Sequence, residues 1–190
     1  MWFRIFNYVG FQAGWLACVA GPGQGLPWIG LPIVGLFLAV HLLLTSARRR
    51  EAMLALLLAL IGTGVESLHL ALGLFQTTTS AWIGWLCPTW LTLLWVNFAP
   101  TLYGSMQWMM GRPLTASLFG AIGGPVSYYA AGQFGAISFP EDPRFSLGAL
   151  AVVWGLAMPG LLRLAQWADR RWGNTASRRE ERDRRERLEG

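Results

Sequence analysis

Apolar residues fill six stretches of roughly twenty residues each, and short segments rich in arginine, glycine or proline separate them. An α-helix of about 20 residues, rising about 1.5 Å per residue, is long enough to cross the hydrocarbon core of a bilayer. The pattern therefore predicts an all-α integral membrane protein, in which residues 1–167 form a compact bundle of six transmembrane helices, several kinked by proline. The expected spans are Trp2–Ala20, Pro27–Ala47, Ala52–Gly73, Thr89–Met110, Arg112–Ala136 and Ser146–Trp167.

The fifth stretch combines small residues, a proline and hydroxyl groups. Gly120, Gly124 and Tyr128 recur at every fourth position, so they lie along one face of a helix. Small residues let a second helix approach closely in lipid, where packing drives association. Pro125 removes a backbone donor, so we expect the helix to bend or open there and to aim Ser127 and Tyr128 inward. The stretch is interpreted either as a tightly packed element, with Gly120, Gly124 and Pro125 in packing roles, or as the wall of a binding site.

Arginine is distributed unevenly between the two ends of the predicted spans. It occurs at Arg4, at 48–50, at Arg112 and in the tail, which lie on alternate turns of a six-span chain, whereas the other connections hold only Arg144. Because basic residues mark cytoplasmic loops, we expect a multi-pass protein with both termini in the cytoplasm. Residues 168–190 are predicted to form a charged cytoplasmic tail, either a solvated helix or a disordered segment.

Polar residues inside the apolar stretches fall at two depths. A rise of about 1.5 Å per residue places Glu66 about 10 Å below the outer surface, with four further polar residues within about one turn of that level. This predicted outer polar layer consists of Glu66, His69, Asn97, Ser127 and Tyr128, with Gln12 near the midplane. A second layer, nearer the cytoplasm, is expected at Asn7, His41, Ser105 and Gln107.

Glu66 is the one acid within the predicted spans. A carboxylate there costs a few kcal/mol unless it is paired, neutralised or hydrated, so it marks a candidate functional site. The alternative is a protonated structural Glu that is bonded to Asn97 or Tyr128. Glu66 and His69 share a helical face and match the Glu-x-x-His pattern of carboxylate-bridged metal bundles. Those bundles need two such pairs and two further carboxylates, so no metal is predicted.

A pair for proton transfer or substrate binding is the favoured interpretation of these two residues. The candidate catalytic residues are thus Glu66 and His69. The candidate substrate-binding residues are Gln12, Asn97, Ser127 and Tyr128.

Composition and motifs narrow the chemistry further. The chain is 54% hydrophobic and 13% charged, and its net charge of +5 resides in loops and tail. Because the basic residues lie where cytoplasmic loops would carry them, no nucleic-acid partner is expected. No phosphate loop or nucleophile motif is present, and no cofactor is expected. Two cysteines exclude a disulfide scaffold and a cysteine-rich metal site. Cys18 and Cys87 are predicted to be free thiols.

Several short motifs are spread over the whole chain apart from its charged tail. They are Asn7-x4-Gln12-x-Gly14-Trp15, Glu66-Ser67, Leu94-Trp95 with Phe98-Ala99, and Gly123-Gly124-Pro125-x-Ser127-Tyr128 with Ala131-Gly132. Together they resemble a bacterial inner-membrane family that is described only as a domain of unknown function. The resemblance implies a compact multi-span protein of the bacterial inner (cytoplasmic) membrane, with an acid at the position of Glu66. It also implies genes that often lie near lipid-modifying enzymes of the cyclopropane-fatty-acid type.

Two functions from different classes follow from these patterns. In the first, the chain binds a membrane lipid or small hydrophobic molecule in a polar cavity of its outer half, for transport or for modification. In the second, it is a non-catalytic subunit or assembly factor whose small-residue helix faces dock another membrane protein, and Glu66 is merely buried. The sequence does not separate an enzyme from a transporter.

Overall fold

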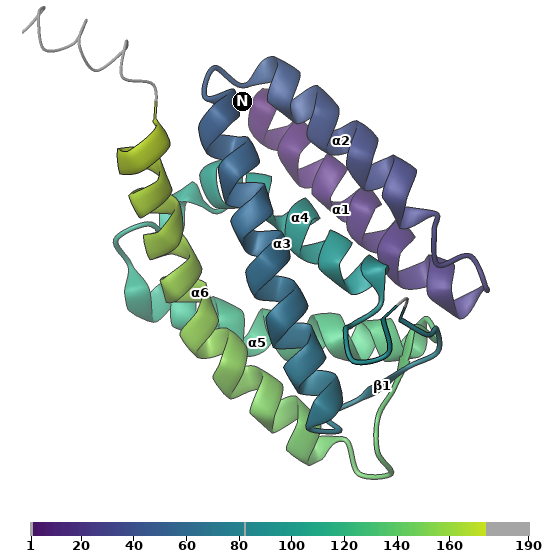
Figure 1. Cartoon of the computed structure of the whole chain (residues 1–190). Helices are drawn as coiled ribbons and strands as arrows, with labels where there is room; N and C mark the ends of the chain where they lie inside the picture. Colours follow the sequence, from purple (N-terminus) through teal and green to yellow (C-terminus); the bar gives the residue numbers. More distant parts are fainter. Residues whose placement is uncertain (1, 82, 174–190) are drawn as a thin grey trace, which may run out of the picture.

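The computed structural model describes residues 2–81 and 83–173, and it is all-α apart from one pair of two-residue strands (Figure 1). The six expected helical segments are all helical. In chain order the elements are α1 (Trp2–Gly23), α2 (Gly30–Leu44), α3 (Arg48–Ala71), β1 (Gln76–Thr77), α4 (Thr89–Tyr103), the 3-10 helix η1 (Gln107–Met109), α5 (Pro113–Gln133), β2 (Ile137–Ser138) and α6 (Arg144–Trp172).

α4 is the central helix of the fold. It packs against α1, α2, α3 and α6, and its buried residues lie on all of its faces. Among the long helices, α5 packs closely along α6, and it also contacts η1 and β2. The molecule therefore consists of a four-helix group, α1 to α4, and a helical hairpin, α5 and α6. The hairpin docks on that group mainly through α6, which lies beside α3 in Figure 1.

Glycines permit the closest helix contacts. A Cβ atom at Gly124 would lie 2.4 Å from Cγ of Trp154, and one at Gly120 would lie 2.2 Å from the Trp154 carbonyl oxygen. Ser117 adds a hydrogen bond of 2.7 Å to the Gly155 carbonyl. The small-residue face of α5 is therefore covered by α6 of the same chain.

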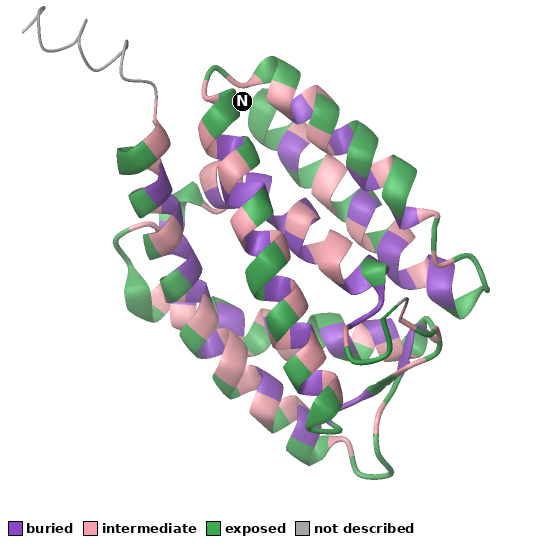
Figure 2. Ribbon diagram, in the orientation of Figure 1, coloured by how far each residue is buried: buried purple, intermediate pink, exposed green. Residues whose placement is uncertain are grey.

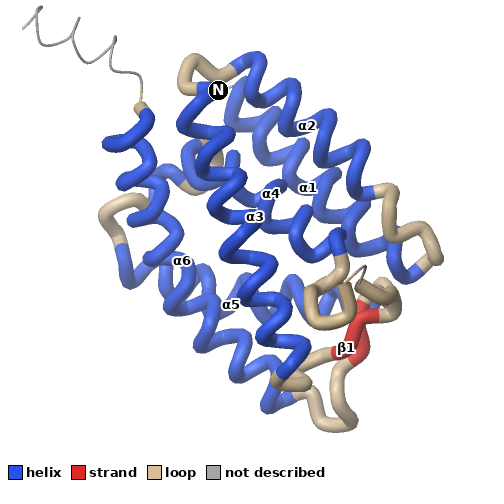
Figure 3. Tube along the Cα trace, viewed as in Figure 1, coloured by secondary structure: helices blue, strands red, loops and turns tan. Residues whose placement is uncertain are grey.

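The antiparallel pair β1–β2 links two loops at one end of the molecule (Figure 3). Gln76 lies opposite Ser138, and Thr77 lies opposite Ile137. Ile137 of β2 and Phe75, which directly precedes β1, are buried and pack in one cluster with Tyr128 of α5. The pair was not expected from the sequence, and it joins the loop that follows α3 to the loop that follows α5.

Two helix ends show how the structure departs from the sequence-based expectation. α4 ends at Tyr103 rather than Met110, because the backbone turns at Gly104, where the Asn7 side chain packs and its Oδ1 accepts the Ser105 N–H at 3.3 Å. α6 extends past Trp167 to Trp172, since Ala168 is buried and Asp169 pairs with Arg50. The rest of the predicted tail, 174–190, lies outside the described residues.

The prolines leave the helices continuous. Pro22, Pro100, Pro125 and Pro159 all lie inside helices, and α5 runs unbroken through Pro125. Of the two outcomes expected at Pro125, a bend or an opening of the helix, the opening does not occur. Gly124, the residue before Pro125, packs against Trp154 of α6.

Outward faces of the helices are apolar. In the described part of the chain, α3 and α6 are long and apolar enough to cross a membrane by length and composition, and α2 is apolar but has only 15 residues. Large apolar side chains lie exposed on several helices (Figure 2), for example a stripe along α5 with one member every four residues. That stripe is Leu114, Leu118, Ile122 and Val126. These surfaces indicate association with a membrane.

Candidate functional site

Glu66 lies at the centre of a buried cluster that joins three helices. Its Oε1 atom accepts a hydrogen bond from Nε1 of Trp95 at 3.0 Å and another from the Tyr128 hydroxyl at 2.5 Å. Its Oε2 atom lies 3.4 Å from Nδ1 of His69. Glu66 is 1% exposed and Tyr128 is 8% exposed, so bulk water does not replace these partners. Since α3 supplies Glu66, α4 supplies Trp95 and α5 supplies Tyr128, this Glu66 cluster connects the hairpin to the four-helix group.

Residue spacing along α3 builds one side of the cluster. The buried positions of α3 are spaced three or four apart, which brings Gly62, Glu66 and His69 onto one face. Gly62 lies one turn before Glu66, and a Cβ atom there would be 2.1 Å from Cγ of Trp95. Because Gly62 has no side chain, the Trp95 indole can lie directly against α3. In this position its N–H donates a hydrogen bond to the Glu66 carboxyl group.

Aromatic rings surround the other partners. The Tyr128 ring lies 5.3 Å from the Phe75 ring and 6.2 Å from the His69 ring, centroid to centroid. Trp154 of α6 stacks on Trp95 at 5.2 Å. Among the described residues, the buried indole N–H of Trp154 makes no hydrogen bond of good geometry. It lies close enough to the Tyr128 hydroxyl to interact with it electrostatically.

A cavity of about 190 Å³ lies against Glu66, between α1 and α4 on one side and α5 and α6 on the other. Its walls are almost wholly apolar and include eight aromatic side chains, and Glu66 is the one carboxyl group among its lining residues. The aromatic lining consists of Phe11, Trp15, Trp90, Trp95, Phe98, Phe119, Tyr128 and Trp154.

The cavity opens sideways, through the space between α1 and α5. These two helices scarcely touch along most of their length. The lining residues on these two helices that keep some exposure form the rim: Phe11 and Trp15 of α1, and Phe119, Gly123 and Ser127 of α5. Near the β1–β2 pair the two helices do meet, since a Cβ atom at Gly23 would lie on the Phe134 carbonyl oxygen. The opening is therefore lateral and is closed at that end.

The structure brings together three of the six residues predicted for the site: Glu66, His69 and Tyr128. Asn97 is buried, but its Nδ2 donates to the Phe11 carbonyl at 2.8 Å, and its amide lies over Gly14 of α1. Ser127 is exposed on the cavity rim and does not reach Glu66. Gln12 is exposed on α1 and does not line the cavity.

Sequence reasoning missed the indole donor Trp95, which was named only as part of a short motif and not as a site residue. It also missed a second buried acid, Glu51 of α3, which is 4% exposed. Glu51 lies 2.7 Å from Arg50 and 3.5 Å from His41, and Arg50 reaches Asp169 of α6 at 2.6 Å. Glu51 lies on the same buried face of α3 as Glu66, and that periodicity is the signal from which it was predictable.

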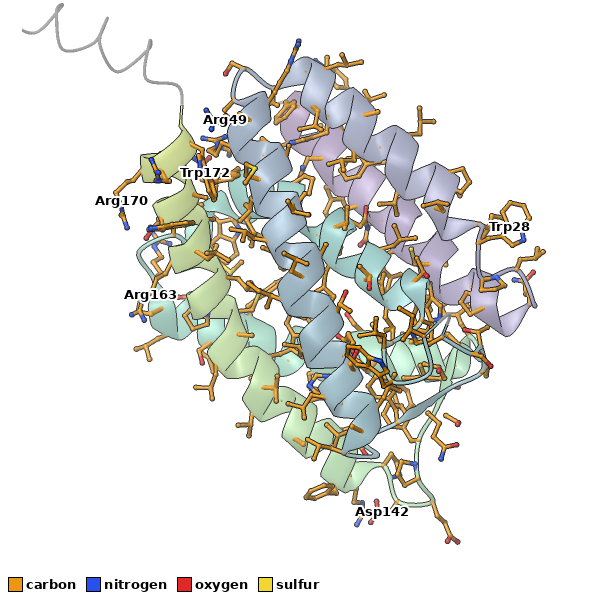
Figure 4. All side chains as sticks on the ribbon, in the orientation of Figure 1. Trp28, Arg49, Asp142, Arg163, Arg170 and Trp172 are labelled. Carbon is orange, nitrogen blue, oxygen red and sulfur yellow. The ribbon has the colours of Figure 1, made fainter. Side chains whose placement is uncertain are left out.

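The predicted inner polar layer is divided in the structure. His41 joins Glu51 and Asn7 contacts Ser105, whereas Gln107 is exposed. The charged cluster around Glu51 lies at the end of the molecule that carries Arg49, Arg170 and Trp172 in Figure 4. The labelled Trp28 and Asp142 lie far from that end.

The two cysteines are free and buried. Cys18 lies against Gly30 of α2, whereas the Sγ atom of Cys87 is 3.7 Å from Oγ1 of Thr92. The Cys87 N–H donates to Ser67 Oγ at 2.9 Å. Burial raises the pKa of the Cys87 thiol, because the thiolate loses its hydration there. Among residues 2–81 and 83–173, His, Cys, Asp and Glu side chains form no group of three or more suited to a metal ion.

The model of one protein family, described as "Protein of unknown function (DUF2878)", matches residues 4–160. This range contains the Glu66 cluster, every residue of the cavity lining and the inner acid Glu51. Neither a curated protein nor a solved structure matches the chain.

Proposed function

The chain belongs to that family, and since the family has no assigned activity, we propose a function from the site itself. The protein is a multi-pass membrane protein that binds a lipid or small hydrophobic molecule in the lateral cavity beside Glu66, for transport or modification. The observation that carries this proposal is the cavity: it is apolar, opens between α1 and α5, and ends on a single buried carboxyl group.

The membrane setting follows from exposed side chains and charge. The outward faces of α2, α5 and α6 carry apolar side chains such as Leu36, Leu118 and Leu156, each at least 66% exposed, which lipid would cover. Arg49 and Arg170 lie at the same end of the molecule (Figure 4), as expected for the cytoplasmic ends of membrane helices. Six spans in a bacterial inner membrane, with both termini in the cytoplasm, account for both features.

Cavity size indicates how much of a ligand enters. An apolar protein cavity of about 150 Å³ holds benzene, so the cavity here, about 190 Å³, accommodates a ring or a short chain segment. A longer ligand extends through the lateral opening into lipid. In this arrangement Glu66 anchors the polar end of the ligand or exchanges a proton with it, and His69 and Tyr128 orient the carboxyl group.

The alternative function, a non-catalytic subunit, was based on small-residue helix faces that would dock another membrane protein, and these faces are covered by helices of the same chain. Gly120 and Gly124 are covered by α6, Gly10 by Phe37 of α2, and Gly14 by Asn97 of α4. A membrane-protein partner would therefore have to dock on a different face of the protein.

Filling the cavity tests the proposal. Gly123 lines the cavity, and a Cβ atom there meets only the edge of Phe119 at 3.9 Å, so Gly123→Leu fills the entrance without disturbing helix packing. Gly160→Leu on α6 is the matched control, because it is exposed, outside the cavity and free of neighbours within 4 Å. Mass spectrometry of molecules co-purified in mild detergent reads out the result.

We expect one dominant species with the wild type and with Gly160→Leu, and its loss with Gly123→Leu. The same molecules in all three samples, or none in any, would overturn the proposal.

A further inference from the structure

We propose that the ligand of this cavity is a hydrophobic organic cation, such as an amphiphile whose polar end is an ammonium group. The inference rests on the proposed function, and it specifies the charge of the ligand. Its carrying observation is the pairing of one buried carboxyl group with walls of aromatic rings, in a cavity that no basic side chain lines.

The charge balance of the cavity favours a positive ligand. Glu66 accepts from two neutral donors, the Trp95 indole and the Tyr128 hydroxyl, which stabilise a carboxylate without cancelling its charge. No arginine, lysine or histidine belongs to the described cavity lining. His69 lies behind Glu66, 3.4 Å from Oε2 and outside the lining. Since buried charges are stable only when paired, the cavity side of this carboxylate is complementary to a cation.

The walls add a second attraction of the same sign. The faces of aromatic rings carry partial negative charge, and cages of such rings are the usual binding sites for quaternary ammonium groups. Trp15 and Phe11 come from α1, Trp90 and Phe98 from α4, and Trp154 from α6, so rings line the cavity on both of its sides. A neutral hydrocarbon needs apolar walls alone, which leucine and valine provide as well. The aromatic lining and the single carboxyl group therefore point to the same ligand class.

Lateral access suits an amphiphilic cation. Such molecules partition into a membrane with the charge near the headgroups and the apolar part in the acyl region. The opening between α1 and α5 is lined by Phe119 and Gly123, without a charged side chain. A cation that enters from lipid thus exchanges its surroundings directly for the aromatic walls and Glu66.

A pair of isosteric probes tests the charge preference. Benzyltrimethylammonium and neopentylbenzene have the same shape and differ in the positive charge, and benzenesulfonate supplies the opposite charge. Each is titrated into the full chain in a maltoside detergent, and tryptophan fluorescence is recorded, to which four tryptophans of the cavity wall contribute. The variants are Glu66→Gln, Gly123→Leu and, as a matched control, Glu141→Gln, which neutralises an exposed acid of the α5–α6 loop.

We expect the cation to bind at least tenfold more tightly than its neutral isostere, which corresponds to about 1.4 kcal/mol. Glu66→Gln should remove this preference, Glu141→Gln should keep it, and benzenesulfonate should not bind. Gly123→Leu, which retains Glu66, should lose the cation even where Glu66→Gln proves too unstable to study. Equal affinity for both isosteres, or equal binding of the cation by wild type and Glu66→Gln, would overturn the inference. If the charge preference fails but a neutral lipid co-purifies with the wild type and not with Gly123→Leu, the proposed ligand-binding function still stands. Failure of this inference is therefore distinguishable from failure of the proposed function.

Discussion

Removing the Tyr128 hydroxyl measures whether Glu66 carries charge in the folded protein. Tyr128→Phe keeps the ring that packs on Phe75 and His69, and it deletes one donor to Oε1 of Glu66. A hydrogen bond to a charged group contributes about 1.5–3 kcal/mol, whereas a neutral interhelical hydrogen bond in a membrane protein contributes about 0.6 kcal/mol. We expect the free energy of unfolding to fall by the larger amount, because the partner is a buried carboxylate.

A double-mutant cycle separates the charge from the geometry. Glu66→Gln keeps an acceptor for Tyr128 and Trp95 but removes the charge, so Tyr128→Phe in that background should cost only about 0.6 kcal/mol. In a chain of this length each kcal/mol shifts the melting temperature by about 2–4 °C. The single variant should therefore melt about 3–12 °C below wild type, and the double variant about 1–2 °C below Glu66→Gln.

Thermal unfolding in maltoside micelles, followed by tryptophan fluorescence, reads out all four proteins. Tyr129→Phe is the matched control, since Tyr129 is 52% exposed and should change the stability by less than about 0.5 kcal/mol. Equal costs of Tyr128→Phe in both backgrounds would refute the reasoning, because Glu66 would then behave as a neutral, structural acid.

Three further predictions concern packing, thiols and topology. Gly62→Ala should destabilise the fold by about 1–3 kcal/mol, because the added Cβ collides with Trp95. Gly64→Ala, which has no neighbour within 4 Å, should instead stabilise the helix by about 0.5–1 kcal/mol, and chemical unfolding of both variants compares the two effects. Cys87 should resist alkylation near pH 8 in the folded protein, because its raised pKa lowers the thiolate fraction. After unfolding without reductant, both cysteines should be alkylated. A linked Cys18–Cys87 peptide in the mass spectrum would contradict this. Reporter fusions should give cytoplasmic signals after Arg50, Arg112 and the C-terminus and periplasmic signals at Gln24, Thr78 and Asp142, and reversed signals at the last two would refute the topology.

The helices were predictable because each apolar stretch is long and bounded by turn-forming or charged residues. Their ends were less so. α4 stops at Tyr103 because Asn7, almost a hundred residues away, packs on Gly104. The strands β1 and β2 contain two residues each and carry no alternating pattern. Such features depend on contacts between distant segments, which one sequence does not reveal.

Depth alone fixed only one coordinate of the candidate site. Glu66 and Tyr128 share a predicted depth and meet in the structure, whereas Asn97 has a similar predicted depth but turns toward Phe11 of α1. Gln12 is rotated by about 100° from the neighbouring Phe11, which lines the cavity, so Gln12 faces outward. The direction of a side chain around its helix axis depends on which helices are neighbours. That arrangement was not readable from the spacing of polar residues.

Photocrosslinking from the cavity rim tests the central claim most directly. A benzoylphenylalanine replaces Phe119 on the rim or, as the control, Phe145, which is 78% exposed on α6 and outside the cavity. After irradiation of native membranes, mass spectrometry of the purified protein identifies the adducts at each position. The account predicts one dominant small-molecule adduct at 119, lost when Gly123→Leu is added, and a spread of bulk lipids at 145. The same lipid spread at both positions would contradict a ligand-binding cavity beside Glu66.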